Sequence, residues 1–320
     1  VMEFNSIKSV YFLGAGGIGM SALVRYFISE GKFVAGYDRT PSPLTSTLIA
    51  EGAELHFEEN IDAIPLECKE KDSTLVVYTP AIPEGHKEWE YFRQHGFTIK
   101  KRAEVLGIIT GNKRGVCVAG THGKTTTSTM TAHLLHQSQT DCAAFLGGIS
   151  KNYHSNLILS EKSDFVVIEA DEFDRSFPQL MPYISVITSM DADHLDVYGT
   201  EQAYCESFEK FAAQVQHALV LKRGLHLRNC EDISATIYTY DVFATSCSSV
   251  DLPHFYADNI RVTNAEIYFD FHTPTHAIAN VQLGVPVWVN VENAVGASAI
   301  ALTYGLAPEK VRHALGTFQG

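Results

Sequence analysis

The chain has 320 residues, 45% of them hydrophobic and 19% charged, which is the composition of a globular protein long enough for two domains. Its formal charge of −13 argues against nucleic acid or an anionic membrane as a partner, although a nucleotide needs only a local positive site. No apolar stretch approaches the roughly 18 residues of a membrane span. The six cysteines are scattered without a C-x-x-C pair, which predicts reduced thiols and a cytoplasmic protein without structural zinc.

A glycine loop between two apolar strands marks the first unit of the chain. Residues 7–13 form an apolar run, and a second predicted strand, Phe33–Tyr37, ends at Asp38. Three glycines with G-x-G-x-x-G spacing lie between the strands and open a helix: Gly14, Gly16 and Gly19. In a Rossmann-like domain such a loop binds a phosphate-bearing ligand, and the acid contacts a ribose. A plain glycine turn is the alternative.

The next predicted strand, Thr74–Tyr78, runs into a loop that begins Thr79-Pro80-Ala81. Ligands of open parallel sheets bind beyond the carboxyl ends of the strands, so this loop could line the same crevice. A turn made rigid by proline is an equally good interpretation.

A second phosphate loop organises the rest of the chain. An apolar run breaks at Gly120, and Gly123, Lys124 and Thr125 follow as a helix begins. Glycines let the backbone approach a phosphate, the lysine reaches its outer oxygens, and the threonine hydroxyl can bind Mg²⁺. The G-x-x-G-K-T spacing is two residues shorter than the common motif, because Val118 stands at the place of the first glycine. This strand–turn–helix pattern predicts a nucleoside-triphosphate site rather than an ordinary turn with a solvated lysine.

Acidic residues follow two further predicted strands. The apolar run Phe165–Ile168 is followed directly by Glu169, and Ile184–Thr188 runs into an acidic segment that starts at Asp191. Acids at strand ends in a phosphate-loop fold are placed to hold Mg²⁺. Any one of them could be a solvated loop carboxylate, and Glu169 is the strongest candidate because it comes first after the apolar run.

The remaining pattern predicts the fold class. We expect an α/β protein, with a Rossmann-like parallel-sheet domain over residues 1–110 and a phosphate-loop (P-loop-type) α/β domain over residues 111–320 that carries an appended antiparallel β segment. The expected elements of the second domain are a strand Cys142–Phe145 with a turn at Gly147-Gly148, a helix Glu201–Gln214, antiparallel strands within 255–288 that include Val287-Trp288, and a helix from Asn290 through Ala301.

Together these segments resemble the Mur ligases, most closely the alanine-adding members of that family. The matching segments cover both halves of the chain: Gly14-Ala15-Gly16-Gly17-Ile18-Gly19-Met20-Ser21, Ala119-Gly120-Thr121-His122-Gly123-Lys124-Thr125-Thr126-Thr127, Glu169-Ala170-Asp171-Glu172-Phe173-Asp174-Arg175-Ser176-Phe177 and Asp193-His194-Leu195-Asp196-Val197-Tyr198-Gly199. The resemblance implies ATP-dependent joining of L-alanine to the carboxylate of UDP-N-acetylmuramate, through an acyl phosphate, in the synthesis of peptidoglycan precursors. Such chemistry depends on positioning and charge neutralisation more than on covalent catalysis.

The resemblance also implies roles for individual residues. ATP would be bound by Gly120, Thr121, Gly123, Lys124, Thr125 and Thr126, with Asn290 and Asn293 at the adenine. One Mg²⁺ (or Mn²⁺) would be held by Thr125 and Glu169 and a second metal by His194, and the catalytic residues would be Lys124, Glu169 and His194. The sugar nucleotide would be bound by Gly14, Gly16, Gly17, Ile18, Gly19, Met20, Ser21, Asp38, Thr79, Pro80 and Ala81, with His122 and Asn156 near the muramyl carboxylate.

The chain departs from the family pattern at a few places. Ser189 stands where asparagine is usual, and Val289 stands where histidine is usual before Asn290. A third domain that contributes to the ATP and amino-acid sites would follow residue 320, so we expect this chain by itself to turn over poorly or not at all.

Three other interpretations remain open from the sequence. The first is an NAD(P)-dependent oxidoreductase that uses the N-terminal glycine loop, the second is a related Mur ligase with another amino acid or peptide as substrate, and the third is a nucleotide-binding switch without catalysis. The oligomeric state has no signal in the sequence.

Overall fold

A computed structural model describes residues 6–171, 177–191, 198–245 and 251–320. The chain divides into two compact units, Val1–Leu106 and Gly107–Gly320, and the division falls inside one helix, α4 (Arg102–Asn112). The expected boundary at residue 110 lies within the same helix. Each unit is described below by itself.

The first unit is built on a five-stranded sheet with the order β3-β2-β1-β4-β5, in which every neighbouring pair is parallel. Its strands are β1 (Ser9–Leu13), β2 (Phe33–Tyr37), β3 (Glu54–His56), β4 (Thr74–Tyr78) and β5 (Thr98–Lys101). Its helices besides α4 are α1 (Ile18–Ser29), α2 (Pro43–Ala50) and α3 (Lys87–Gln94). The strand order reverses beside β1, so the loops after β1 and β4 meet at the point where open parallel sheets bind ligands.

A buried carboxylate ties three elements of the first unit together. The Glu88 side chain on α3 is fully buried and accepts hydrogen bonds from Tyr11 Oη at 2.6 Å, His56 Nε2 at 2.9 Å and the backbone N–H of Asn60 at 3.0 Å. Burial raises the pKa of Glu88, but these hydrogen bonds lower it by more, so the pKa lies below its ordinary value. The anionic form is therefore the one that the fold stabilises.

The second unit contains a ten-stranded sheet with the order β15-β14-β13-β12-β11-β10-β6-β9-β7-β8. The strands from β7 to β13 in this order run parallel, and antiparallel pairs are added at both edges, β7·β8 on one side and β13·β14·β15 on the other. The strands are β6 (Arg114–Ala119), β7 (Ala143–Ser150), β8 (Ser155–Ile158), β9 (Phe165–Glu169), β10 (Pro182–Ile187), β11 (Ala218–Lys222), β12 (Thr236–Val242), β13 (Phe255–Thr263), β14 (Glu266–His272) and β15 (Ala277–Leu283). This mixed sheet, together with the parallel sheet of the first unit, confirms the predicted α/β fold class.

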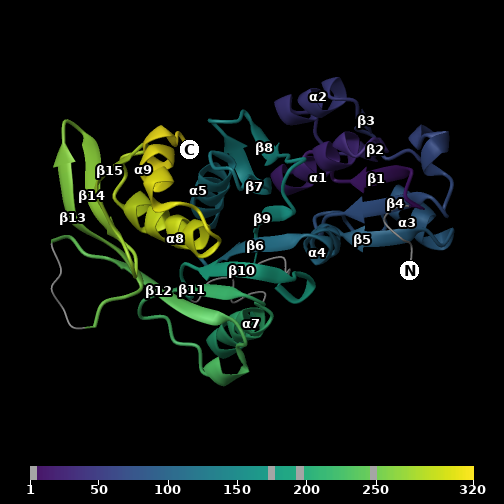
Figure 1. The fold of residues 1–320 in the computed structure, drawn as a ribbon. Coiled ribbons are helices and arrows are strands. Elements are labelled where there is room, and N and C mark those ends of the chain that lie inside the picture. Colours follow the sequence, from purple (N-terminus) through teal and green to yellow (C-terminus); the bar gives the residue numbers. More distant parts are fainter. Residues whose placement is uncertain (1–5, 172–176, 192–197, 246–250) are drawn as a thin grey trace. The chain divides into compact units, whose positions relative to one another are not determined.

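Helices cover both faces of this sheet. Helices α5 (Lys124–His136), α8 (Val289–Thr303) and α9 (Pro308–Thr317) pack together on one face, and α7 (Glu201–Ala213) lies on the other (Figure 1). The core between the first three helices and the sheet is apolar, and it includes Met130 of α5 and Ile300 of α8, both fully buried.

Two predictions about local structure were wrong. Gly147 and Gly148 do not form a turn but continue strand β7 as far as Ser150. Val287 and Trp288 are not part of a strand, because Trp288 has helical dihedral angles and is the N-cap residue of α8. In addition, β13 is antiparallel only to β14, since it pairs in parallel with β12.

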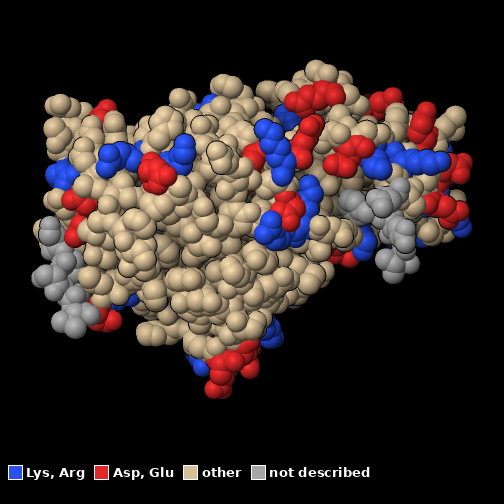
Figure 2. All heavy atoms as spheres, in the orientation of Figure 1, with Lys and Arg blue, Asp and Glu red and all other residues tan. Residues whose placement is uncertain are grey.

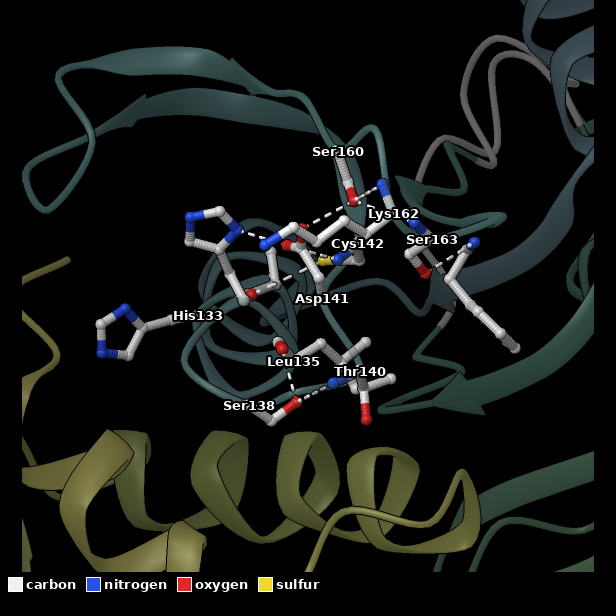
Figure 3. A network of polar contacts seen from close by, with 12 residues as sticks. His133, Leu135, Ser138, Thr140, Asp141, Cys142, Ser160, Lys162 and Ser163 are labelled. Carbon is white, nitrogen blue, oxygen red and sulfur yellow. Dashed lines mark hydrogen bonds and ion pairs between the residues drawn. The ribbon is translucent and has the colours of Figure 1, made fainter.

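A polar network fixes the C-terminal end of α5 (Figure 3). Asp141 has a left-handed φ of 53°, and its carboxylate accepts from Ser160 Oγ at 2.6 Å and from the backbone N–H of Cys142 at 2.8 Å. His136 Nδ1 lies 2.6 Å from the same carboxylate. The network joins α5 to the start of β7 and to the segment before β9.

In the described part of the chain, no helix is long and apolar enough to cross a bilayer. On the face shown in Figure 2, acidic and basic side chains occur in small mixed groups separated by wide areas without charge. That face carries no continuous field of one sign.

Candidate functional site

Strand β6 ends in a tight loop, Gly120–Gly123, which we call the phosphate loop. Gly120 and Gly123 have left-handed φ values of 138° and 82°. A Cβ on Gly120 would overlap Thr188 Oγ1, and one on Gly123 would lie 2.6 Å from Asn293 Oδ1. Only glycine satisfies both the dihedral angles and the space at these two positions.

Helix α5 begins directly after the phosphate loop, with Gly123 as its N-cap residue and no side-chain cap. Its first N–H groups have no acceptor within the helix, because the first such bond runs from Thr127 N to Gly123 O at 2.9 Å. The Lys124 ammonium lies over the loop, where it donates to Gly120 O at 2.7 Å and Thr121 O at 3.4 Å. Uncapped amides, the helix dipole and one ammonium together make an anion site.

A hydroxyl and a carboxylate meet beside this anion site. Thr125 Oγ1 lies 3.1 Å and 3.0 Å from the two carboxylate oxygens of Glu169. The contact follows from the sheet order, because β9 is the direct neighbour of β6 and Glu169 is its last residue. Gly147 of β7 lies against the same carboxylate, and a Cβ there would overlap Glu169 Oε2 and stand 3.0 Å from Thr125 Oγ1.

This pair of side chains fits a hard divalent cation. Mg²⁺ binds oxygen ligands at about 2.0–2.1 Å in octahedral geometry, so two adjacent ligands lie about 2.9 Å apart. The separation of 3.0 Å between Thr125 Oγ1 and Glu169 Oε2 matches that spacing. The described residues contain no group of three or more His, Cys, Asp or Glu able to hold a metal.

A chain of amides links helix α8 to the phosphate loop. Thr127 Oγ1 donates to Asn293 Oδ1 at 3.2 Å, Asn293 Nδ2 donates to Asn290 Oδ1 at 3.1 Å, and Asn290 Nδ2 donates to Val285 O at 3.3 Å. Both asparagines are buried. The two side chains predicted to contact adenine therefore also fix the start of α8 against α5.

The segment after β10 holds the phosphate loop from its other side. Thr188 Oγ1 donates to His122 O at 2.5 Å, the backbone N–H of His122 donates to Ser189 Oγ at 2.8 Å, and Thr121 N donates to Ser189 O at 3.3 Å. The His122 side chain is exposed. Ser189, one of the departures from the family pattern, thus supplies an acceptor for the loop backbone.

The glycine loop of the first unit, residues 14–19, is equally close-packed. Gly14 has a φ of 88°, and a Cβ there would lie 2.5 Å from Thr79 Cγ2. The backbone N–H of Gly16 donates to Asp38 Oδ2 at 2.6 Å, and Thr40 N donates to Asp38 Oδ1 at 3.0 Å. The structure therefore brings Asp38 and Thr79 to this loop, and the Asp38 carboxylate supports the loop backbone.

The other predicted residues of the first unit lie at the start of α1 or on the loop after β4. Gly17 is the N-cap of α1 and has no side-chain cap, so the first N–H groups of this helix have no acceptor within it. Ile18 and Gly19 open the helix, Met20 and Ser21 are buried in it, and Pro80 and Ala81 are exposed.

The remaining predicted residues of the second unit are Thr126, Asn156 and His194. Thr126 is half-buried in the first turn of α5, and Asn156 is fully buried in β8. His194, predicted as a metal ligand, lies outside the described residues.

Several contributors to the site escaped the sequence analysis. Gly147 had a visible signal, since a Gly-Gly pair inside a strand marks a close approach, but the pair was interpreted as a turn. Thr188 and Tyr204 had none, because each contacts the phosphate loop from more than 60 residues away in the chain. Such contacts depend on strand order, which no local pattern specifies.

These features define a class: a phosphate-loop α/β unit preceded by a Rossmann-like unit, each with a glycine-lined anion site. Two family models match the chain, "Mur ligase family, catalytic domain" over residues 9–114 and "Mur ligase middle domain" over residues 118–301. The chain belongs to the Mur ligase family.

Among curated relatives, a UDP-N-acetylmuramate–L-alanine ligase of Phocaeicola vulgatus is 56% identical, covering 100% of this chain and 68% of its own length. A protein of the same name from Porphyromonas gingivalis is 50% identical, with coverage of 98% and 68%. Among solved structures, the UDP-N-acetylmuramate–alanine ligase of Thermotoga maritima is 26% identical with a TM-score of 0.82, covering 98% of this chain and 69% of that one.

Proposed function

We propose that this chain is part of an ATP-dependent ligase that joins L-alanine to the carboxylate of UDP-N-acetylmuramate in the cytoplasm. The names of the relatives at 50–56% identity support this substrate assignment.

The observation that carries the proposal is the Thr125–Glu169 pair beside the phosphate loop. A Mg²⁺ ion, when bound, would neutralise phosphate charge, and Thr125 and Glu169 are the described residues that would hold it. The amides at the start of α5 orient the phosphates, and Lys124 exchanges its contacts with Gly120 O and Thr121 O for phosphate oxygens. The terminal phosphate is thereby placed for attack by the substrate carboxylate.

The glycine loop of the first unit is assigned to the diphosphate of the sugar nucleotide. Its uncapped helix N-terminus suits a diphosphate. The Asp38 carboxylate accepts the backbone N–H groups of Gly16 and Thr40 and so supports the loop that would receive the diphosphate. An oxidoreductase would leave the phosphate loop without a role, and we do not favour that alternative.

Binding and turnover test separate parts of the proposal. Isothermal titration of this chain with UDP-N-acetylmuramate, and with ATP in the presence and absence of Mg²⁺, should give two independent sites, the second dependent on Mg²⁺. Lys124→Gln should weaken ATP binding and leave the sugar nucleotide unaffected. A folded chain that binds NADH, detected by fluorescence, but no UDP-sugar would overturn the assignment.

The choice of amino-acid substrate is tested by an assay of the full-length protein. Release of phosphate from ATP should require UDP-N-acetylmuramate and should be fastest with L-alanine when glycine, L-serine and L-alanine are compared. Equal rates with all three, or a preference for a peptide, would replace the alanine assignment with that of another ligase of the family.

A further inference from the structure

The phosphate loop has an anchor that its sequence motif does not include. The Thr121 side chain is 9% exposed, and its hydroxyl lies 2.8 Å from Asp191 O and 2.7 Å from Tyr204 Oη. Since Thr121 donates its one proton to the Asp191 carbonyl, the Tyr204 hydroxyl is the donor to Thr121. The two hydrogen bonds form a chain in which the Tyr204 hydroxyl donates to the Thr121 hydroxyl and the Thr121 hydroxyl donates to the Asp191 carbonyl.

Tyr204 is held rigidly on helix α7. The side chain is fully buried, and its ring makes edge contacts with Tyr198 at 5.2 Å and Phe208 at 5.2 Å between centroids. The helix start is fixed by Thr200, whose hydroxyl accepts from Ala203 N at 3.1 Å. The hydroxyl of Tyr204 is therefore a fixed donor that reaches the phosphate loop from the sheet face opposite α5.

The loop needs such anchors because its two glycines restrict it little. Gly120 and Gly123 flank Thr121 and His122, and glycine loses more conformational freedom on ordering than any other residue. A loop that is already ordered binds its ligand more tightly, because the ordering cost is not subtracted from the binding free energy. Through the hydroxyl of Thr121, helix α7 contributes to that ordering.

We propose that Tyr204 is a positioning residue for the nucleotide: acting through Thr121, its hydroxyl holds the phosphate loop in the conformation that receives the triphosphate. The inference rests on the proposed ATP site. It assigns Tyr204 no contact with ATP, and it assigns the Thr121 hydroxyl to the protein rather than to the ligand. The role concerns nucleotide affinity and leaves the sugar-nucleotide site unaffected.

The chain offers a matched control for the loss of a buried hydroxyl. Tyr240 on β12 is also fully buried, but among the described residues its hydroxyl has no hydrogen-bond partner. Tyr204→Phe should raise the dissociation constant for ATP–Mg²⁺ about three- to tenfold, the effect of one neutral hydrogen bond. Tyr240→Phe should leave that constant unchanged, and neither change should alter the constant for the UDP-sugar.

A double-mutant cycle tests whether Tyr204 acts through Thr121. Thr121→Val should weaken ATP binding at least as much as Tyr204→Phe, and Tyr204→Phe should then have no further effect in the Thr121→Val background. Thr121→Ser keeps the hydroxyl and should retain most of the affinity. In the full-length enzyme the effect of Tyr204→Phe should appear in KM for ATP, with kcat nearly unchanged.

The outcomes separate the two proposals. If the unchanged chain does not bind ATP–Mg²⁺, the proposed function fails and the inference fails with it. If it binds, but Tyr204→Phe behaves like Tyr240→Phe, or the effects of Tyr204→Phe and Thr121→Val add fully, only the inference is overturned. Should Tyr204→Phe fold poorly in a thermal melt, the comparison of Thr121→Ser with Thr121→Val decides, and equal affinities for those two variants would overturn it.

Discussion

Gly147 lies against the carboxylate of Glu169, so closely that a methyl group on its α-carbon would overlap Glu169 Oε2. The next residue, Gly148, has only Thr125 Cγ2 nearby, 3.5 Å from the place of an added Cβ. The two adjacent glycines of strand β7 therefore differ in the space that is available for a side chain. Gly147 makes room for the carboxylate that points at Thr125, and Gly148 does not.

Gly147→Ala should therefore displace Glu169 and weaken Mg²⁺-dependent ATP binding by at least tenfold, about 1.4 kcal/mol. Gly148→Ala, the matched change one residue along, should weaken it by less than twofold. Titration with ATP at several Mg²⁺ concentrations measures both. If both variants lost the same affinity for ATP, the substitutions would be acting by disturbing strand β7 and not by displacing the Glu169 carboxylate.

Ser189→Ala should weaken ATP binding about fivefold, because the His122 N–H loses its acceptor at 2.8 Å and a hydrogen bond of this kind contributes about 1 kcal/mol. Ser189→Asn, which keeps a side-chain oxygen, should retain more of the affinity. Ser298→Ala is the control, since Ser298 is fully buried on α8 and its hydroxyl has no hydrogen-bond partner among the described residues. A loss of affinity in the control as large as in Ser189→Ala would contradict the prediction.

Asp38→Asn should destabilise the first unit by about 1–3 kcal/mol, because an amide has one oxygen and can replace the carboxylate for only one of its two backbone donors. The glycine loop should then bind UDP-N-acetylmuramate less tightly. Thermal unfolding and titration with the sugar nucleotide measure the two effects. The exposed Asp72, changed to Asn, removes the same charge and should change neither quantity.

Acidification should destabilise the second unit through His133. This side chain is 2% exposed between Tyr153 Oη at 2.8 Å and Thr317 Oγ1 at 3.0 Å, and burial lowers its pKa to about 4. In the unfolded chain a histidine binds its proton near pH 6.5. The unfolded state therefore binds more protons between these values, so the free energy of unfolding should fall as the pH drops from about 6.5 to about 4, by up to about 3 kcal/mol.

Denaturant unfolding as a function of pH isolates this effect when His133→Gln is compared with the unchanged chain. The variant should lose the part of the slope that lies between pH 6.5 and 4, whereas a change at the exposed His226 to Gln should retain it. Parallel curves for the His133→Gln variant and the unchanged chain would mean that carboxylates account for the whole acid sensitivity.

Strands that are buried on both faces were predicted well from the sequence. Phe33–Tyr37 and Thr74–Tyr78 have the predicted bounds, because a central parallel strand is a continuous apolar run that ends where polar loop residues begin. The sequence also indicated that Thr125 and Glu169 lie near each other, because both come at the carboxyl ends of predicted parallel strands, which share one edge of the sheet.

Predictions of local structure failed where a residue makes a contact with another residue that is far away in the sequence. Gly147-Gly148 has the composition of a turn, but one of these glycines is needed for the approach of Glu169, and the strand continues through both. Val287-Trp288 has the composition of a strand, but Trp288 opens a helix whose Asn293 must reach Thr127. Asp38 contacts the glycine loop of residues 14–19, as its place after the second strand indicated, although its backbone donors, Gly16 and Thr40, could not be deduced from spacing.

Strand β6 lies between β10 and β9 in the sheet, so the start of the phosphate loop has a neighbouring strand end on each side. Glu169 ends β9, and Thr188 comes directly after β10. The two neighbours belong to separate stretches of the chain, and each carries a side chain that contacts the loop or the first turn of α5. The loop therefore takes its conformation only when all three strands have paired, which makes the site a late product of folding rather than of the local motif.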